Sequence, residues 1–270
     1  MTGLGTPHPQ DHEVLARTYL ARVLACLGET RQAAEEGLKA IERARALQHQ
    51  PSLAVALTLG CRQAWLLRDP ALVQQRAAEL MKLSEDQGFP YWLARGRCYA
   101  GWVAVTEGRV EEGLALLTNA LSHFDTTDVA MGNIAGIIGD AYARAGHLAT
   151  ALRHLDDALH VSAKTGEVWM DAELHRLTGV VLGAGPAAKA KSAEMHLLRA
   201  LEIARSQGAK LWELRAATSL ARLWACHRKF TEALELLAPV RRWFTGDRST
   251  PDLAEAEMLI SELVDAARCP

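Results

Sequence analysis

Two helix-forming segments meet at a glycine in the stretch Gly139-Asp-Ala-Tyr-Ala-Arg-Ala-Gly146-His-Leu-Ala-Thr-Ala151-Leu-Arg-His-Leu-Asp-Asp-Ala158-Leu-His-Val-Ser-Ala-Lys-Thr-Gly166. Gly146 stands where the chain would reverse, and Gly139, Ala151 and Ala158 stand where two antiparallel helices would approach closely. The same marks recur 38 residues earlier, at Gly101, Gly108, Gly113 and Ala120, and 118 residues earlier, at Ala21, Gly28, Ala33 and Ala40. A fixed period of small residues on paired helices is typical of helical repeat arrays, so the stretch predicts an all-α fold.

The charge and the cysteine content indicate which cellular compartment and which kinds of partner to expect. The 270 residues carry 30 Lys and Arg against 32 Asp and Glu, and this net charge of -2 indicates no global attraction to nucleic acid or to an anionic membrane. The five cysteines are far apart and form no CxxC pair, which favours reduced thiols and a cytoplasmic location. No basic, apolar leader and no long apolar run is found, so no membrane partner is expected.

Amphipathic patterns divide the chain into about six helix pairs and a C-terminal capping helix. The pairs are expected over residues 11–48, 52–87, 91–124, 129–164, 168–207 and 211–244, and the capping helix over 251–267. Residues 1–10 are rich in Gly and Pro and are expected to form a disordered lead, which leaves 11–270 as one repeat domain. Asp11 and Thr250 are expected to be helix N-caps, and a looser reversal is expected at Gly183–Lys189.

The repeat length is longer than that of the commonest helical repeats. Setting Ala40, Glu79, Ala120, Ala158, Ala200 and Val240 in register gives steps of 39, 41, 38, 42 and 40 residues. The usual tetratricopeptide repeat has about 34 residues, so each second helix is expected to be extended. The joints after Gly88, Gly166 and Gly208 are each followed by a tryptophan, which we interpret as packing residues (Trp92, Trp169 and Trp212).

The helix pairs resemble tetratricopeptide repeats. More narrowly, the segment Gln207-Gly-Ala-Lys-Leu-Trp212-Glu-Leu-Arg-Ala-Ala-Thr-Ser-Leu-Ala-Arg-Leu-Trp224, followed by Leu236-Leu-Ala-Pro-Val-Arg-Arg-Trp-Phe-Thr245, resembles the C-terminal repeat region of large bacterial signalling proteins. Those proteins carry an AAA-type or STAND-type ATPase, often with a class III adenylate or guanylate cyclase. The resemblance extends over nearly the whole chain from about His8 and implies a right-handed α-α superhelix that regulates or binds a partner. Met1 falls where a member of that family would be in mid-chain.

Local motifs for catalysis and metal binding are missing from the sequence. It contains no GxxxxGK[ST], no GxGxxG after a strand and no HExxH. The adjacent carboxylates Asp156 and Asp157 diverge by about 100° on a helix, so they cannot act as a paired acid and base. We therefore expect no catalytic residue, no cofactor and no metal, and an enzyme with an unrecognised site is only the third hypothesis.

The tetratricopeptide resemblance implies a concave groove lined by the first helix of each pair. Its positions lie three before, and one, four and five after, the small residue at the closest helix contact. They place in the groove Arg22, Trp65, Cys98, Trp102, Gly136, Asp140, Arg144, Arg176, Thr218 and Arg222. One turn earlier on the same helices come Arg95, Asn133, Glu173 and Arg215. Six arginines there face two acids, and the planar guanidinium fork suits carboxylate or phosphate, while Trp102 can stack on a planar group. The alternative is that these arginines pair with acids on neighbouring helices.

The leading functional hypothesis is a non-enzymatic interaction module or regulatory scaffold in bacterial signalling. It would bind a peptide or a partner domain of acidic character in the groove. The alternative is a nucleic-acid-binding solenoid that uses the groove arginines and tryptophans, although the near-neutral charge does not favour nucleic acid as a partner. The first helix carries an apolar stripe of Leu15, Val23 and Leu27, which would pack on an upstream helix pair in the family that the chain resembles. Part of this stripe is expected to lack cover here, which predicts self-association through this helix.

Overall fold

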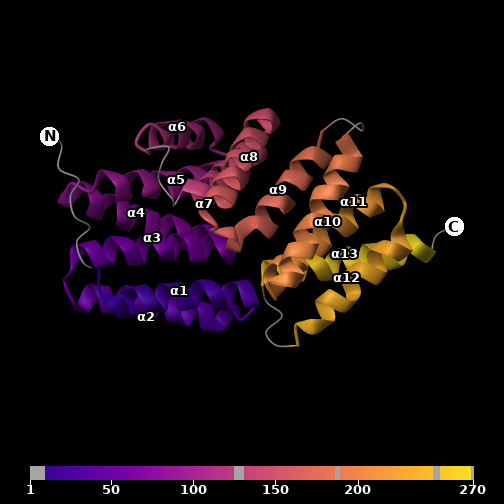
Figure 1. Ribbon diagram of the computed structural model, residues 1–270, viewed down its shortest axis with the longest axis horizontal. Helices are drawn as coiled ribbons and strands as arrows, with labels where there is room; N and C mark the ends of the chain where they lie inside the picture. The colour runs from indigo at the N-terminus through magenta and orange to yellow at the C-terminus, as the bar shows by residue number, and fades with distance from the viewer. Residues whose placement is uncertain (1–9, 125–130, 186–188, 246–249, 269–270) are drawn as a thin grey trace. The chain divides into compact units, whose positions relative to one another are not determined.

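The computed structural model describes residues 10–124, 131–185, 189–245 and 250–268. Thirteen α-helices and the short 3-10 helix η1 (Val168–Met170) make up the regular structure of these ranges (Figure 1). The α-helices pack in sequential pairs, which confirms the all-α fold with six pairs and a closing helix. Within the described ranges, no helix is long and apolar enough to cross a bilayer.

The first of two compact units contains three helix pairs. Its helices are α1 (His12–Leu27), α2 (Thr30–Ala46), α3 (Gln50–Leu66), α4 (Pro70–Gln87), α5 (Pro90–Thr106) and α6 (Val110–Leu121). Helix α3 packs on α2, α4 and α5, and α5 packs on α4 and α6. Their apolar faces enclose a core that includes Val14, Ile41, Ala44, Ala54, Ala56, Leu57 and Leu80.

The second unit contains three further pairs and the closing helix. Its helices are α7 (Met131–Arg144), α8 (Leu148–Thr165), α9 (Asp171–Gly183), α10 (Ala190–Ser206), α11 (Lys210–Cys226), α12 (Phe230–Trp243) and α13 (Pro251–Arg268). Helix α9 touches both α7 and α11, and α11 touches α13. The first helices of this unit therefore form one continuous layer, on which α8, α10 and α12 pack pairwise.

Short polar side chains start three of the helices. The backbone N–H of Val14 donates to Asp11 Oδ1 at 2.9 Å, and that of Leu72 donates to Asp69 Oδ1 at the same distance. The N–H of Leu253 donates to Thr250 Oγ1 at 3.4 Å. Each bond satisfies a donor that a helix start leaves open, so the expected caps at Asp11 and Thr250 are confirmed.

Small residues are required where the two helices of a pair cross. A β-carbon on Gly113 would lie 2.6 Å from the carbonyl oxygen of Gly101, and one on Gly139 would lie 2.8 Å from Leu155 Cγ. Neither gap admits a side chain without a shift of the neighbouring helix. The repeating small residues that predict the fold are therefore the points of closest contact.

The register of the second pair differs by one residue from the sequence-based expectation. Leu80 is fully buried on α4, whereas Glu79 is partly exposed and lies 2.7 Å from Arg45 in an ion pair. The reason is that Leu80 shares the buried face with Val73 and Ala77, at helical spacing, while the preceding residue points about 100° away. With Leu80 in place, the steps from Ala40 to Val240 are 40, 40, 38, 42 and 40 residues.

Two sequence-based expectations concern residues beyond those described. The predicted disordered lead, residues 1–10, lies outside the described residues except for Gln10. The predicted reversal at Gly183–Lys189 includes residues 186–188, which also lie outside them.

Candidate functional site

Eight of the predicted groove residues lie on the layer of first helices in the second unit. They are Gly136, Asp140 and Arg144 on α7, Glu173 and Arg176 on α9, and Arg215, Thr218 and Arg222 on α11. The side chain of Asn133 on α7 lies outside the described residues. The neighbouring helix α13 contributes two acids that the sequence analysis did not assign to the groove, Asp252 and Glu255.

A buried guanidinium lies at the centre of this layer. Arg215 Nε and Nη2 donate to the two carboxylate oxygens of Asp252, at 2.7 and 2.9 Å. The Nη1 atom lies 3.6 Å from Glu173 Oε1, and the three side chains are at most 8% exposed. Burial alone would lower the pKa of Arg215, but the charges of Asp252 and Glu173 outweigh burial, and the pKa is raised. Arg215 therefore remains charged and joins α9, α11 and α13.

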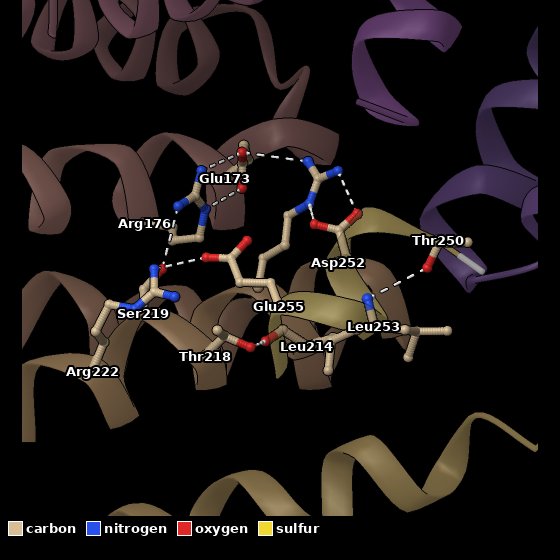
Figure 2. A network of polar contacts seen from close by, with 11 residues as sticks. Glu173, Arg176, Leu214, Thr218, Ser219, Arg222, Thr250, Asp252, Leu253 and Glu255 are labelled. Carbon is tan, nitrogen blue, oxygen red and sulfur yellow. Dashed lines mark hydrogen bonds and ion pairs between the residues drawn. The ribbon is translucent and has the colours of Figure 1, made fainter. Parts of the chain in front are cut away.

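A second guanidinium, that of Arg176, binds the Glu173 carboxylate that also lies near Arg215 (Figure 2). Arg176 Nε and Nη2 each donate to Glu173 at 2.7 Å, and Arg176 Nη1 donates to Ser219 Oγ at 3.2 Å. Burial opposes the charged form of Arg176, yet the negative charge and hydrogen bonds of Glu173 leave its pKa raised. Glu173 thus bridges Arg176 and Arg215, and the two arginines are held by residues of the protein itself.

Two further ion pairs lie at the border of this network. Arg144 Nε donates to Asp140 Oδ2 at 2.9 Å on α7, and Arg222 Nη1 donates to Glu255 Oε1 at 2.7 Å between α11 and α13. The Arg222 side chain is 55% exposed, in contrast to Arg215. Thr218 is buried and donates its hydroxyl to the Leu214 carbonyl oxygen, so its polar group is used within α11.

The predicted local excess of arginine is therefore wrong for the second unit. The guanidinium groups of Arg144, Arg176, Arg215 and Arg222 face the carboxylates of Asp140, Glu173, Asp252 and Glu255. Asp252 and Glu255 fall outside the predicted groove because the sequence pattern predicts the last helix to be a cap with no inner face. A signal was present in the sequence, since Asp252 and Glu255 stand three residues apart and so on one side of a helix.

The first unit presents a different surface, between α1 and α3. A small pocket there is lined by Thr18, Tyr19, Arg22, Leu59, Arg62, Gln63 and Leu66. The Tyr19 side chain is 48% exposed, and the Arg22 guanidinium lies 4.9 Å from the centroid of its ring. Arg22 is thus a predicted groove residue that borders this small pocket, whose lining combines positive charge, an aromatic ring and apolar side chains.

Two buried arginines lie close to this pocket within the first unit. Arg62 on α3 is 6% exposed and Arg95 on α5 is 2% exposed. Burial lowers the pKa of Arg62, and the positive charges of Arg95 and Arg22 lower it further, although Tyr99 opposes this. Arg95 Nη1 donates to the Tyr91 hydroxyl at 2.8 Å, whereas Arg95 Nε has no acceptor among the described residues. Arg62 was not predicted, because the positional rule used for the groove does not include its position on α3.

The aromatic and thiol groups predicted for the groove are buried. Trp65 and Trp102 are each 4% exposed, so neither presents an open face of its ring for stacking. Cys98 is fully buried, and this burial raises the pKa of its thiol to about 12, which keeps the thiol protonated and unreactive at neutral pH. Across the residues that the structure describes, no cluster of three or more His, Cys, Asp or Glu side chains has the arrangement of a metal site.

Comparison with protein-family models and with curated protein sequences finds no match. Among solved structures, the chain is similar to aspartyl phosphate phosphatase F from Bacillus subtilis, with a TM-score of 0.56 and 13% identity over 91% of this chain. The chain spans 62% of the length of that structure. A STAND signal-transduction ATPase with a tetratricopeptide repeat sensor, from Pyrococcus horikoshii, matches with a TM-score of 0.47 and 14% identity, over 96% of this chain and 38% of the other. These similarities concern the fold, an array of tetratricopeptide-like helix pairs.

Proposed function

We propose that the protein is a non-enzymatic interaction module that binds an acidic segment of a peptide or partner protein. The binding surface is the pocket between α1 and α3, and the setting is regulation in bacterial signalling. Arrays of tetratricopeptide-like helix pairs typically mediate protein–protein interaction, which supports a binding role for the fold. The resemblance of the segment from Gln207 to Thr245 to bacterial signalling proteins supports the setting.

The observation that carries this proposal is the grouping of Arg22, Arg62 and Tyr19 around one hollow. A guanidinium fork binds a carboxylate through two parallel hydrogen bonds, and a partly exposed tyrosine adds apolar contact area at a small cost in side-chain entropy. Arg95 adds positive charge close to Arg62, and its Nε is a buried donor with no acceptor in the described ranges. An incoming carboxylate would reduce the electrostatic cost of gathering these cations.

The second unit is a weaker candidate because its inner arginines already bind carboxylates. A ligand acid would have to displace Asp252 or Glu173 from Arg215, and both are buried. Removing one partner of such a pair leaves the other charge buried and unpaired, which costs about 3 to 5 kcal/mol. The proposed ligand is therefore assigned to the first unit.

An array of immobilised peptides with graded net charge tests this proposal. The intact protein should bind the acidic peptides, and Arg22→Ala should weaken the binding of the best peptide by about tenfold, equal to about 1.4 kcal/mol for one charge-assisted contact. Tyr19→Ala should weaken it by a smaller factor. The affinity should fall as salt is added, because the exposed part of the field is screened.

The matched control is Arg31→Ala on α2, an arginine of the same unit whose side chain is 78% exposed. Its affinity for the same peptide should equal that of the unchanged protein. Equal losses for Arg22→Ala and Arg31→Ala would indicate nonspecific charge attraction and would contradict the proposal. Tight binding of single-stranded oligonucleotides with no preference among the peptides would favour the nucleic-acid alternative instead.

A further inference from the structure

The solvent-exposed face of α10 carries a stripe of residues in which two apolar residues have charged residues on both sides of them along the helix. Met195 is 61% exposed and Leu198 is 45% exposed, whereas most apolar side chains of α10 point inward. A shallow surface hollow is lined by Lys191, Glu194, Met195, Leu198, Arg199 and Glu202. These residues follow one another at intervals of three, one, three, one and three, which places all six on one face of the helix.

The order of charges along this stripe is self-complementary. Read from the helix start, it runs positive, negative, apolar, apolar, positive and negative. Reversing the direction exchanges every positive position with a negative one and leaves the apolar centre in place. The midpoint falls between His196 and Leu197, and the symmetric partners are Lys191 with Glu202, Glu194 with Arg199, and Met195 with Leu198.

We propose that this face of α10 binds the same face of a second copy of the chain, antiparallel and about a two-fold axis. In such an isologous contact, residue i of one copy meets residue j of the other, and j meets i. Met195 of each copy would lie against Leu198 of its partner. Lys191 and Glu194 of each copy would pair with Glu202 and Arg199 of the partner, so the contact would contain four ion pairs in all. Like charges would meet in a parallel arrangement with matched residues, so the pattern selects the antiparallel one.

The contacts that these side chains make within one copy are compatible with this pairing. Arg199 Nη1 lies 2.7 Å from Glu202 Oε2, but the two side chains are 54% and 69% exposed, and an exposed pair of this kind is weak enough to rearrange. Glu194 Oε1 accepts from Trp224 Nε1 at 2.6 Å and lies 3.9 Å from Lys229 Nζ, and the Glu194 side chain is 34% exposed. Its second oxygen and the remaining donors of Arg199 are chemically able to bind across the two-fold axis.

The expected dimer is weak. A contact made by one helix from each copy buries less than the total of about 1,200 Å² that stable interfaces need. Dimerisation should therefore be detected only at high protein concentration and should be sensitive to salt, because the four ion pairs lie at the rim. The dimer does not depend on the proposed ligand pocket, which belongs to the first unit.

Sedimentation velocity over a concentration series tests the contact through charge exchange. Lys191→Glu should weaken dimerisation by about tenfold, because a carboxylate would then face the Glu202 carboxylate at both of these contacts in the dimer. Glu202→Lys should weaken dimerisation to the same extent, because two ammonium groups would then face each other at both contacts. The double variant, Lys191→Glu with Glu202→Lys, restores opposite charges and should recover the original dissociation constant. Leu198→Lys should abolish the dimer, and circular dichroism should show unchanged helix content for all four proteins.

The matched control is Met258→Glu on α13, an exposed methionine (64%) outside the stripe, which should leave the dimer unchanged. Three results would overturn the inference. The first is a monomer at every concentration, and the second is a double charge variant that is no better than either single one. The third is a dimer that resists Leu198→Lys but is lost with Val23→Lys on α1, which would assign self-association to the first helix.

Discussion

Arg215 and Asp252 form a buried two-point ion pair between α11 and α13, with N···O distances of 2.7 and 2.9 Å. This pair ties the closing helix to the layer of first helices, over a separation of 37 residues in sequence. It also decides the role of one predicted groove arginine, since a guanidinium that is already bound on two sides by Asp252 and Glu173 is not available to a ligand.

Arg215→Ala is predicted to lower the free energy of unfolding by about 3 to 5 kcal/mol, because it leaves Asp252 buried without its cation. Urea denaturation followed by circular dichroism measures the change. Arg222→Ala is the control, because its side chain is 55% exposed, and it should cost at most about 1 kcal/mol. The double variant Arg215→Met with Asp252→Leu should be more stable than Arg215→Ala, and equal losses from Arg215→Ala and Arg222→Ala would show that burial of the pair is unimportant.

Gly139→Leu is predicted to destabilise the protein by about 1 to 3 kcal/mol, because even the first added carbon would lie 2.8 Å from Leu155 Cγ. The measurement is the thermal midpoint together with the free energy of unfolding in urea. Ala163→Leu adds the same side chain at an exposed position of the partner helix α8 and should change neither value appreciably. An unchanged midpoint for Gly139→Leu would contradict the close approach of α7 and α8.

Gly146→Ala is predicted to lower the free energy of unfolding by about 1 kcal/mol, because the substitution strains the backbone at a positive φ. Gly146 has a φ of +81°, and an added β-carbon would meet no atom within 4 Å, so no packing change is expected. The equivalent turn before α12 holds Arg228 at a φ of +60°, and Arg228→Gly should leave stability unchanged or slightly raised. A neutral Gly146→Ala, measured in urea, would show that the turn relaxes to a right-handed conformation.

The stability of the α9–α10 contact is predicted to depend on pH. His175 Nδ1 and His196 Nδ1 lie 3.0 Å apart, and burial, followed by the charges of His196 and Arg199, lowers the pKa of His175 to about 4. The unfolded chain, with a His pKa near about 6.5, binds more protons than the folded one between these values. The stabilising contribution is therefore complete above about pH 6.5 and is lost as the pH falls toward 4.

Replacing this half-buried histidine tests the dependence. Between about pH 6.5 and 4, protonation of His175 should lower the free energy of unfolding by about 1 to 3 kcal/mol, a range that is reduced because solvent screens part of the ring. His175→Gln should flatten the plot of unfolding free energy against pH over this range. Urea titrations at small, regular pH steps give the measurement. His160→Gln, at an exposed position of α8, is the control and should retain the original slope. The same slope in His175→Gln would show that other groups cause the loss.

The helix pairs and their order follow from the amino-acid sequence alone. The close approach of two helices tolerates only small side chains, so Gly101 with Gly113, and Gly139 with Ala151, mark the crossings of α5 with α6 and of α7 with α8. The amphipathic stripes follow from the need to bury one face of each helix. The starts of two helices also depend only on neighbouring residues, since Asp11 and Thr250 each accept a hydrogen bond from the backbone N–H three residues ahead. Even here the register of the second pair was misplaced by one residue, because Glu79 and Leu80 differ only in which side of α4 they face.

The partner of each charged side chain depends instead on how the helices pack. Helical spacing places Arg22, Arg95, Arg176 and Arg215 on first helices, but it does not indicate what lies opposite each of them. Arg215 meets Asp252 because α11 and α13 pack side by side, and Arg22 borders a hollow because α1 and α3 enclose it with Tyr19 and Arg62. Coulombic contacts act over a few ångströms between residues far apart in the chain, so a periodic pattern predicts the face of a helix and not the partner that the face meets.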